Sequence, residues 1–173
     1  MTEGVPKSSA YEKPDMTMKS YFKFLDEDQK AMRSGTWDYK NPKWVLNQWK
    51  DDFERVDDSL LSDEGRQSKW NALWLWYHHA SQFAYKEGDT QTALVFIDKA
   101  LEFREKGGLT NQITPLLKLL YLGDVEGAKA FAATIPQKRE ANTPDGRIEV
   151  VDNPERTMAT ELIAYYEAQS PND

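Results

Sequence analysis

The pattern of apolar and polar positions is most regular between Trp70 and Glu105, where it predicts two helices separated by a break at Gly88. At about 100° per residue, the apolar residues of the first helix fall on two opposite sides. One side holds Trp70, Leu73, Tyr77, Ser81 and Ala84, and the other holds Ala72, Trp76, His79 and Phe83. Because a surface helix has only one apolar stripe, we expect this helix to be packed on both sides.

The break at Gly88 carries the signals of a helix end followed directly by a helix start. Gly suits the left-handed position just after a helix, and Asp89 can cap the next helix by accepting from its free N–H groups. That helix has a single stripe, made of Ala93, Leu94, Ile97, Ala100 and Leu101. It is expected to end at the run Lys106-Gly107-Gly108.

This hairpin resembles a tetratricopeptide repeat, in which an aromatic-rich helix is followed by Gly-Asp and two small contact residues. Gly88 matches the turn glycine of the family, Ala93 the small residue where the helices cross, and Ala100 the second small contact. Tyr77 stands where the family often has Trp. Two positions depart from the pattern, because Ser81 replaces a usual Gly and Glu105 stands where Pro often closes the repeat.

A second copy resembles the first over the run Leu119-Leu120-Tyr121-Leu122-Gly123-Asp124. Gly123 lies 35 residues after Gly88, close to the family period of about 34, and Ala128 follows it as Ala93 follows Gly88. Pro115 should shorten or kink the first helix of this copy, and Pro136 should truncate the second. Over residues 70–136 the resemblance implies a right-handed stack of antiparallel hairpins; the alternative is an ordinary helical bundle.

The remainder of the chain contains further helix signals on both sides of this region. Residues 1–15 are expected to be a flexible tail, and a first helix should begin at Met16 or Thr17 and stop at Ser34-Gly35. Asn41-Pro42 has the form of a cap followed by proline at the first helical position, so a second helix is expected from there to about Leu61.

Residues 137–152 show no helical period and are expected to form a loop, with a turn at residues 143–146 and a short extended piece at residues 148–151. Asn153-Pro154 repeats the helix start signal. The last helix, residues 153–169, has a stripe of Met158, Leu162, Tyr165 and Tyr166, and should cap the stack. The sequence therefore predicts an all-α protein of about seven helices. Residues 16–173 would form one domain, with N-terminal helices at 16–65 and repeat-like hairpins at 66–136.

Composition restricts the classes of function. The 173 residues carry a net charge of −7 and the pI is about 5.0, which argues against non-specific binding to nucleic acid or to an anionic membrane. The absence of cysteine excludes disulfides and thiolate chemistry. No apolar run approaches the roughly 20 residues of a membrane span, and the N-terminus lacks the apolar core of a signal peptide, so a cytoplasmic location is expected.

Residues that could carry chemistry are few. The only histidines, His78 and His79, are adjacent on a helix and point about 100° apart, so they cannot hold one metal ion together. Nucleophile-elbow and phosphate-loop motifs are missing. We therefore expect no catalytic, metal-binding or cofactor-binding residues. The alternative is a small helical enzyme with a site between helices near Tyr77, His78 and Glu87, beside Trp76.

Charge is the most informative feature. Seven acids lie within fourteen residues, opposed there only by Arg55, and give the segment a charge of −6. They are Asp51, Asp52, Glu54, Asp57, Asp58, Asp63 and Glu64. One interpretation is a solvated outer face of the second helix. The other is a docking surface whose acids steer a basic partner protein.

The six tryptophans all lie between residues 37 and 76. Trp37 and Trp44 are hard to place in a core, and Trp is enriched at binding hot spots. The candidate partner-binding residues are therefore Trp37, Trp44, Asp51, Asp52, Asp57, Asp58, Asp63 and Glu64. We expect a non-catalytic protein-binding module, such as an adaptor, a co-chaperone, or an immunity-type inhibitor of a toxin. A structural part of a larger assembly is a third hypothesis, and the sequence leaves the oligomeric state open.

Overall fold

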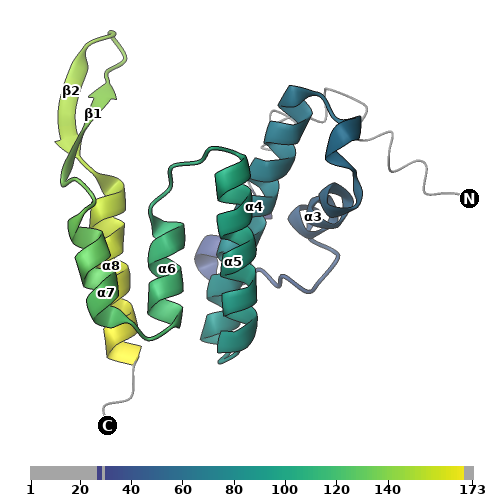
Figure 1. Ribbon diagram of the computed structural model, residues 1–173, viewed down its shortest axis with the longest axis horizontal. Coiled ribbons are helices and arrows are strands. Elements are labelled where there is room, and N and C mark those ends of the chain that lie inside the picture. Colours follow the sequence, from purple (N-terminus) through teal and green to yellow (C-terminus); the bar gives the residue numbers. More distant parts are fainter. Residues whose placement is uncertain (1–26, 29, 170–173) are drawn as a thin grey trace, which may run out of the picture. The chain divides into compact units, whose positions relative to one another are not determined.

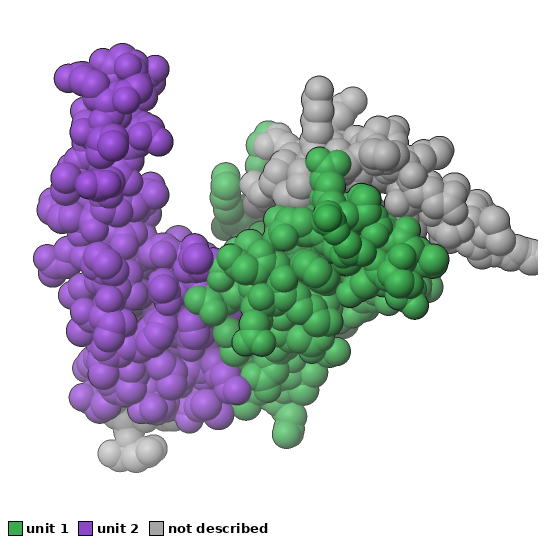
Figure 2. Space-filling model, turned by 45° about the horizontal axis from the view of Figure 1, so that its top comes forward, with its two compact units in different colours: residues 1–109 green, residues 110–173 purple. Residues whose placement is uncertain are grey.

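The computed structural model describes residues 27–28 and 30–169 of the chain, and in them the protein is mainly α-helical with one small sheet (Figure 1). The chain divides into two compact units, residues 1–109 and residues 110–173 (Figure 2). The tail expected at residues 1–15 and the start of the first helix lie outside the described residues. That residues 16–173 form a single domain stays a prediction. The division into two compact units does not show whether either unit can fold without the other.

The first unit consists of helices. Residues 30–34 are helical, and Gly35, with φ 79°, follows them at the expected stop. After a connection come α3 (Val45–Arg55), the 3₁₀ helix η1 (Asp58–Leu60), α4 (Asp63–Lys86) and α5 (Thr90–Lys106). The second unit holds α6 (Ile113–Tyr121), α7 (Val125–Ala133), β1 (Lys138–Asn142), β2 (Ile148–Asp152) and α8 (Pro154–Gln169).

Helix α4 is the central element of the first unit, as the two apolar sides of its sequence predict. It packs against both α3 and α5. Leu73 and Ala84 from one predicted side are fully buried, and Ala72 and Trp76 from the other are 3% and 4% exposed. Burial from both sides confirms that this helix lies inside the unit.

The two predicted Gly-Asp turns are confirmed and are built alike. Gly88 has φ 86° and Gly123 has φ 79°, in the left-handed region that favours glycine. The side chain of Asp89 accepts from the Thr92 N–H at 3.0 Å and caps α5. At the second turn, Asp124 caps α7 in the same way. Each turn therefore ends one helix and starts the next within two residues.

The prediction for the start of α3 is wrong by three residues. Asn41 and Pro42 form a turn instead, in which the Asn41 side chain accepts from the Lys43 N–H at 3.0 Å. The helix begins at Val45, where the N-cap residue Trp44 gives no side-chain hydrogen bond. The Asp28 carboxylate supplies an acceptor instead, and the Leu46 N–H donates to it at 2.6 Å. A residue distant in sequence thus helps to set this helix boundary.

The predicted end of α3 at about Leu61 is also wrong. The helix stops at Arg55, and Val56 and Asp57 are extended. Asp57 then accepts from the Ser59 N–H at 2.9 Å and starts the short helix η1. Local capping by an Asp competes here with the continuing apolar stripe.

Residues 137–152 are not the predicted loop, although the turn and the extended piece within them are found. Strands β1 and β2 pair antiparallel, with Lys138 opposite Asp152 and Asn142 opposite Ile148. The Thr143 N–H donates to the Arg147 carbonyl at 2.7 Å and closes the turn. Neither strand buries one face, so the apolar alternation that identifies a strand in a sequence is missing from β1.

Helix α8 begins at Pro154 as predicted, and Asn153 accepts from the Glu155 N–H at 3.2 Å. It packs against α6 and α7. The predicted stripe is wrong in part, because Met158 and Tyr165 are 49% and 44% exposed. The buried residues are Ala159, Ile163 and Tyr166. A small alanine at the contact lets the helices approach closely, and the larger neighbours face outward.

Among the helices in the described part of the chain, none combines the length and the apolar character needed to cross a membrane.

Candidate protein-binding surface

The acidic segment, residues 51–64, runs over the second half of α3, the whole of η1 and the first turn of α4. It was expected to be either a solvated face or a free docking surface. Lysine and arginine side chains of the first unit lie among these acids. Their positions determine how many of the carboxylates have no ion pair.

Lys50 holds the acids of α3. Its Nζ lies 2.9 Å from Glu54 and 3.7 Å from Asp51, and it sits 4.5 Å from the centre of the Trp76 ring, in cation–π range. Glu54 also accepts a hydrogen bond from the Tyr77 hydroxyl. Burial and this hydrogen bond raise the pKa of Tyr77 well above its usual value, so the phenol stays protonated. Glu54 is therefore part of the α3–α4 packing.

Lys69 holds the acid at the start of η1. Its Nζ lies 2.6 Å from the Asp58 carboxylate and donates to the Val56 carbonyl at 2.7 Å. Burial acts to raise the pKa of Asp58, but the hydrogen bond and the charge of Lys69 outweigh it, so that pKa lies below its usual value. The Asp58–Lys69 pair thus ties the chain after α3 to α4.

Two arginines also form ion pairs with acids of this segment. Arg55 pairs with Asp52 at 2.5 Å, and Arg66 pairs with Asp63. Lys50, Arg66 and Lys69 lie just outside residues 51–64, so the charge of −6 did not include them. Over residues 50–69, seven acids and four cations leave −3. The candidate acids Asp51, Asp52, Asp58 and Asp63 therefore all lie in ion pairs, some at helical spacing and one between η1 and α4.

The acids that remain available lie around η1. Among the described residues, no ion pair involves Asp57 or Glu64, and both are exposed. Hydrogen bonds from Ser59 lower the pKa of Asp57, so it is charged at neutral pH. Leu60 lies between them in the chain with 69% of its surface exposed. Asp57, Leu60, Asp63 and Glu64 are called the η1 surface below.

The structure removes Trp37 from the candidate surface. It is 2% exposed, and its ring makes edge contacts with Phe83 and Trp76 at centroid distances of 5.2 and 5.9 Å. Trp37, a candidate partner-binding residue because it was hard to place in a core, is therefore buried, since the segment before α3 folds against the aromatic side of α4. Trp44 is only partly buried, with the Lys43 Nζ 4.8 Å from its ring.

Asn47 was missed by the sequence analysis, although it links three segments of the first unit. Its Oδ1 accepts from the Trp76 Nε1 at 2.8 Å. Its Nδ2 donates to the carbonyls of Asp38 and Asn41 at 2.9 and 2.8 Å. The side chain is buried, with 5% of the residue exposed. The only signal in the sequence is an amide between the apolar residues Leu46 and Trp49.

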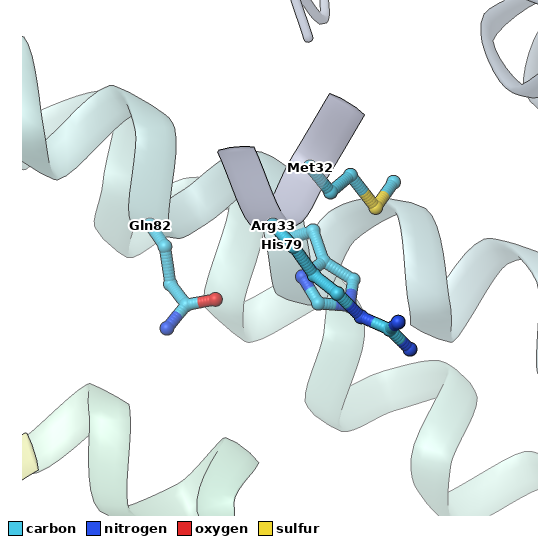
Figure 3. Close-up of a pocket in the computed structure, with 4 residues that line it drawn as sticks. All are labelled: Met32, Arg33, His79 and Gln82. Carbon is cyan, nitrogen blue, oxygen red and sulfur yellow. The ribbon is translucent and has the colours of Figure 1, made fainter. Parts of the chain in front are cut away.

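The two histidines are held neutral inside the first unit. Burial, and then the neighbouring His79, lower the pKa of His78 well below its usual value. Burial, and then the charge of Arg33, lower the pKa of His79 to about 4. His79 lines a pocket of about 310 Å³ together with Met32, Arg33 and Gln82 (Figure 3). None of these four described side chains is a carboxylate.

The residues of the alternative enzyme site are not brought together. Tyr77 and His78 are buried in the middle of α4, whereas Glu87 is exposed at its end. Nine residues of helix, or about 14 Å, separate His78 from Glu87. Glu87 instead accepts from the Tyr39 hydroxyl at 3.3 Å and lies 3.9 Å from Lys40. Within the described residues, no three His, Asp or Glu side chains are arranged to hold a metal ion.

Comparison with known proteins gives no further guide, since no protein family, curated protein or solved structure matches this chain.

Proposed function

We propose that this protein is a non-catalytic protein-binding module that takes a basic segment of a partner protein on the η1 surface. The observation that carries the proposal is Leu60, an apolar side chain that is 69% exposed and is flanked in the chain by the exposed acids Asp57 and Asp63. An apolar contact rimmed by charges is the usual anatomy of an interface. The carboxylates would steer a partner rich in Lys and Arg, and Leu60 would provide the apolar contact.

The proposal uses only part of the original candidate set. Asp52 and Asp58 are paired with Arg55 and Lys69 and contribute to the structure of the unit. Asp57, Asp63 and Glu64 remain at the rim; the Asp63 carboxylate is 98% exposed although it contacts Arg66. A partner that replaces Arg66 at Asp63 loses little, because an exposed ion pair contributes only about 0–1 kcal/mol.

We propose further that the α4–α5 and α6–α7 hairpins are tetratricopeptide-like repeats. Supporting this are the left-handed Gly88 and Gly123, the capping Asp89 and Asp124, and buried alanines five residues after each glycine. Proteins built from such repeats commonly serve as binding scaffolds. An adaptor and an inhibitor of a basic toxin would both use this kind of surface.

The test is a variant that neutralises the η1 surface without disturbing its turns. Leu60→Ala, Asp57→Asn and Glu64→Gln together remove the apolar contact and two charges, while Asn can still cap η1. A matched control carries Leu122→Ala, Glu105→Gln and Glu161→Gln, which change another exposed leucine, at 57%, and two exposed acids elsewhere.

The measurement is quantitative affinity capture from lysate of the source cells, followed by titration of the captured partner. We expect the partner to be basic, to bind the control variant like the natural protein, and to bind the η1 variant at least about tenfold more weakly. Binding should weaken with added salt. Equal capture by both variants, or a partner without a basic segment, would exclude the η1 surface as the binding site.

A further inference from the structure

Among the described residues, β1 and β2 are the whole of their sheet, so both edges of the hairpin are open, and β2 carries an exposed apolar row. Ile148 and Val150 are two residues apart, lie on the same face of β2, and are 65% and 68% exposed. A two-stranded hairpin is marginally stable in water at best, and three or more strands are normally needed. Figure 1 shows the hairpin extending beyond the ends of α7 and α8, so helices of its own unit do not cover most of its length.

The hydrogen bonds of the hairpin determine which backbone groups face outward. The Thr143 N–H donates to the Arg147 carbonyl at 2.7 Å, and the Asn153 N–H donates to the Gln137 carbonyl at 2.9 Å. In an antiparallel pair, residues with bonds to the partner strand alternate with residues whose N–H and C=O point away. In this register, the N–H and C=O groups that point away from the hairpin belong to Ile148, Val150 and Asp152 on β2. On β1 they belong to Lys138, Glu140 and Asn142.

The two open edges differ in how they can meet a second copy of the same edge. A twofold axis normal to a sheet places one residue of the strand opposite itself, and pairing over a whole five-residue strand puts its middle residue there. On β1 the middle residue is Glu140, and like charges directly opposite each other are destabilising. Lysine on an edge strand is also a common device against edge pairing. On β2 the central residue is Val150, and its self-contact is apolar.

We propose that the outer edge of β2 pairs with the same edge of a second copy of this chain, antiparallel and centred on Val150. Val150 then faces Val150 of the other copy, Ile148 faces Asp152, and Glu149 faces Val151, so no like charges are directly opposed. The Val150, Ile148 and Asp152 backbone groups of both copies form hydrogen-bonded pairs. The two hairpins become a four-stranded sheet with Ile148 and Val150 of both copies in one apolar row.

The antiparallel register also separates the helices of the two copies. Helix α8 begins directly after β2 and runs away from the hairpin (Figure 1). In the proposed pairing, the α8 helices therefore lie beyond opposite ends of the sheet. The edge of a five-residue strand buries little surface, so the dimer belongs to the small, weak class of interfaces and forms at high protein concentration.

The test uses Val150→Pro, with Glu140→Pro as the matched control. Both positions face outward, so proline removes an N–H that the hairpin itself does not use, and proline is tolerated on an edge strand. In the dimer, the Val150 N–H is donated once by each copy. Val150→Pro therefore removes two hydrogen bonds between copies and should raise the dissociation constant at least about tenfold. Glu140→Pro should leave it unchanged.

Sedimentation equilibrium of the full chain, up to millimolar concentration, measures the dissociation constant. Amide exchange identifies the edge: Val150 should gain protection as concentration rises, and Glu140 should not. Protection of Val151, which lies inside the hairpin, shows in each variant that the strands remain paired. A monomer at all concentrations, or a dimer that survives Val150→Pro with the hairpin intact, would overturn the proposal. If the β2 edge paired only with a strand of a different protein, this chain would be a monomer at all concentrations.

Discussion

The two units have cores of different chemistry. In the first unit, large aromatic side chains donate hydrogen bonds to polar side chains, from Trp76 to the buried Asn47 and from Tyr77 to the exposed Glu54. In the second unit, the fully buried residues of α6, α7 and α8 are mostly aliphatic, Leu116, Leu117, Ala128 and Ala159, together with Thr114, and two tyrosines are also buried. Both units nevertheless contain a helical hairpin with the same Gly-Asp turn.

This difference indicates what each core requires. Tryptophan and tyrosine carry an N–H or O–H that needs a partner when buried, so an aromatic core must also contain acceptors at fixed places. A core of leucine and alanine carries no such requirement and depends on volume alone. We therefore expect the first unit to be more sensitive than the second to loss of polar groups, and to pH in the range where histidine titrates.

The largest expected effect is that of Asn47→Leu. It leaves the Trp76 N–H without its acceptor and removes one of the two hydrogen bonds that each of the Asp38 and Asn41 carbonyls accepts, and we expect a loss of about 3 kcal/mol in the free energy of unfolding. The neighbouring Gln48→Leu is the control, since the exposed Gln48 bonds only the Pro42 carbonyl among the described residues. Urea unfolding followed by tryptophan fluorescence reports the first unit alone, because all six tryptophans lie in it. Similar losses in the two variants would contradict a polar requirement.

A pH effect confined to the first unit comes next in size. The folded pKa of His79 is about 4 and that of His78 is also lowered, so between pH 6.5 and 4 the unfolded chain binds more protons. Stability is present above pH 6.5 and is lost as the pH falls toward 4, by about 3 kcal/mol at most for His79. Asp28 acts in the opposite direction, because burial raises its pKa.

Fluorescence-detected urea unfolding at pH 7 and pH 5 measures this loss. His79→Gln should reduce the difference between the two pH values, and the second unit, which has no histidine, should show no matching change in its amide exchange. An unchanged pH difference in His79→Gln would show that this residue does not carry it.

The smallest expected effect concerns the Gly-Asp turn that both units contain. Gly88→Ala and Gly123→Ala each place a Cβ on a residue with positive φ, where nothing else lies within 4 Å. The penalty is therefore conformational, about 1–2 kcal/mol at either site. Amide exchange of α5 and of α7 can measure it separately in each hairpin. Clearly unequal penalties would show that the two turns are not equivalent despite their matching angles.

Features set by a few neighbouring residues could be predicted from the sequence. Gly88-Asp89 and Gly123-Asp124 end and start helices through their own φ angles and side-chain caps. Asn153-Pro154 starts α8 for the same kind of local reason. The double apolar pattern of α4 also predicted its central position, because burial on two sides leaves a periodic trace in the sequence.

Features set by contacts between distant residues could not be predicted in this way. The start of α3 depends on Asp28, and the strand β1 depends on its pairing with β2 rather than on its own polar sequence. Trp37 was assigned to the surface because its partners Trp76 and Phe83 come some 40 residues later. A count over residues 51–64 alone also omits Lys50, Arg66 and Lys69, which pair with acids of that segment.

The carboxylate of Asp28 has a consequence for the order in which the first unit assembles. It bonds the Leu46 amide from 18 residues upstream, and Trp44 offers no cap of its own. The opening turn of α3 therefore gains its side-chain cap only when the helical segment that carries Asp28 has docked. Until that moment, Asn41 and Pro42 offer the nascent chain a competing place to begin the helix. Exchange of a single amide, that of Leu46, would thus time the arrival of the N-terminal segment.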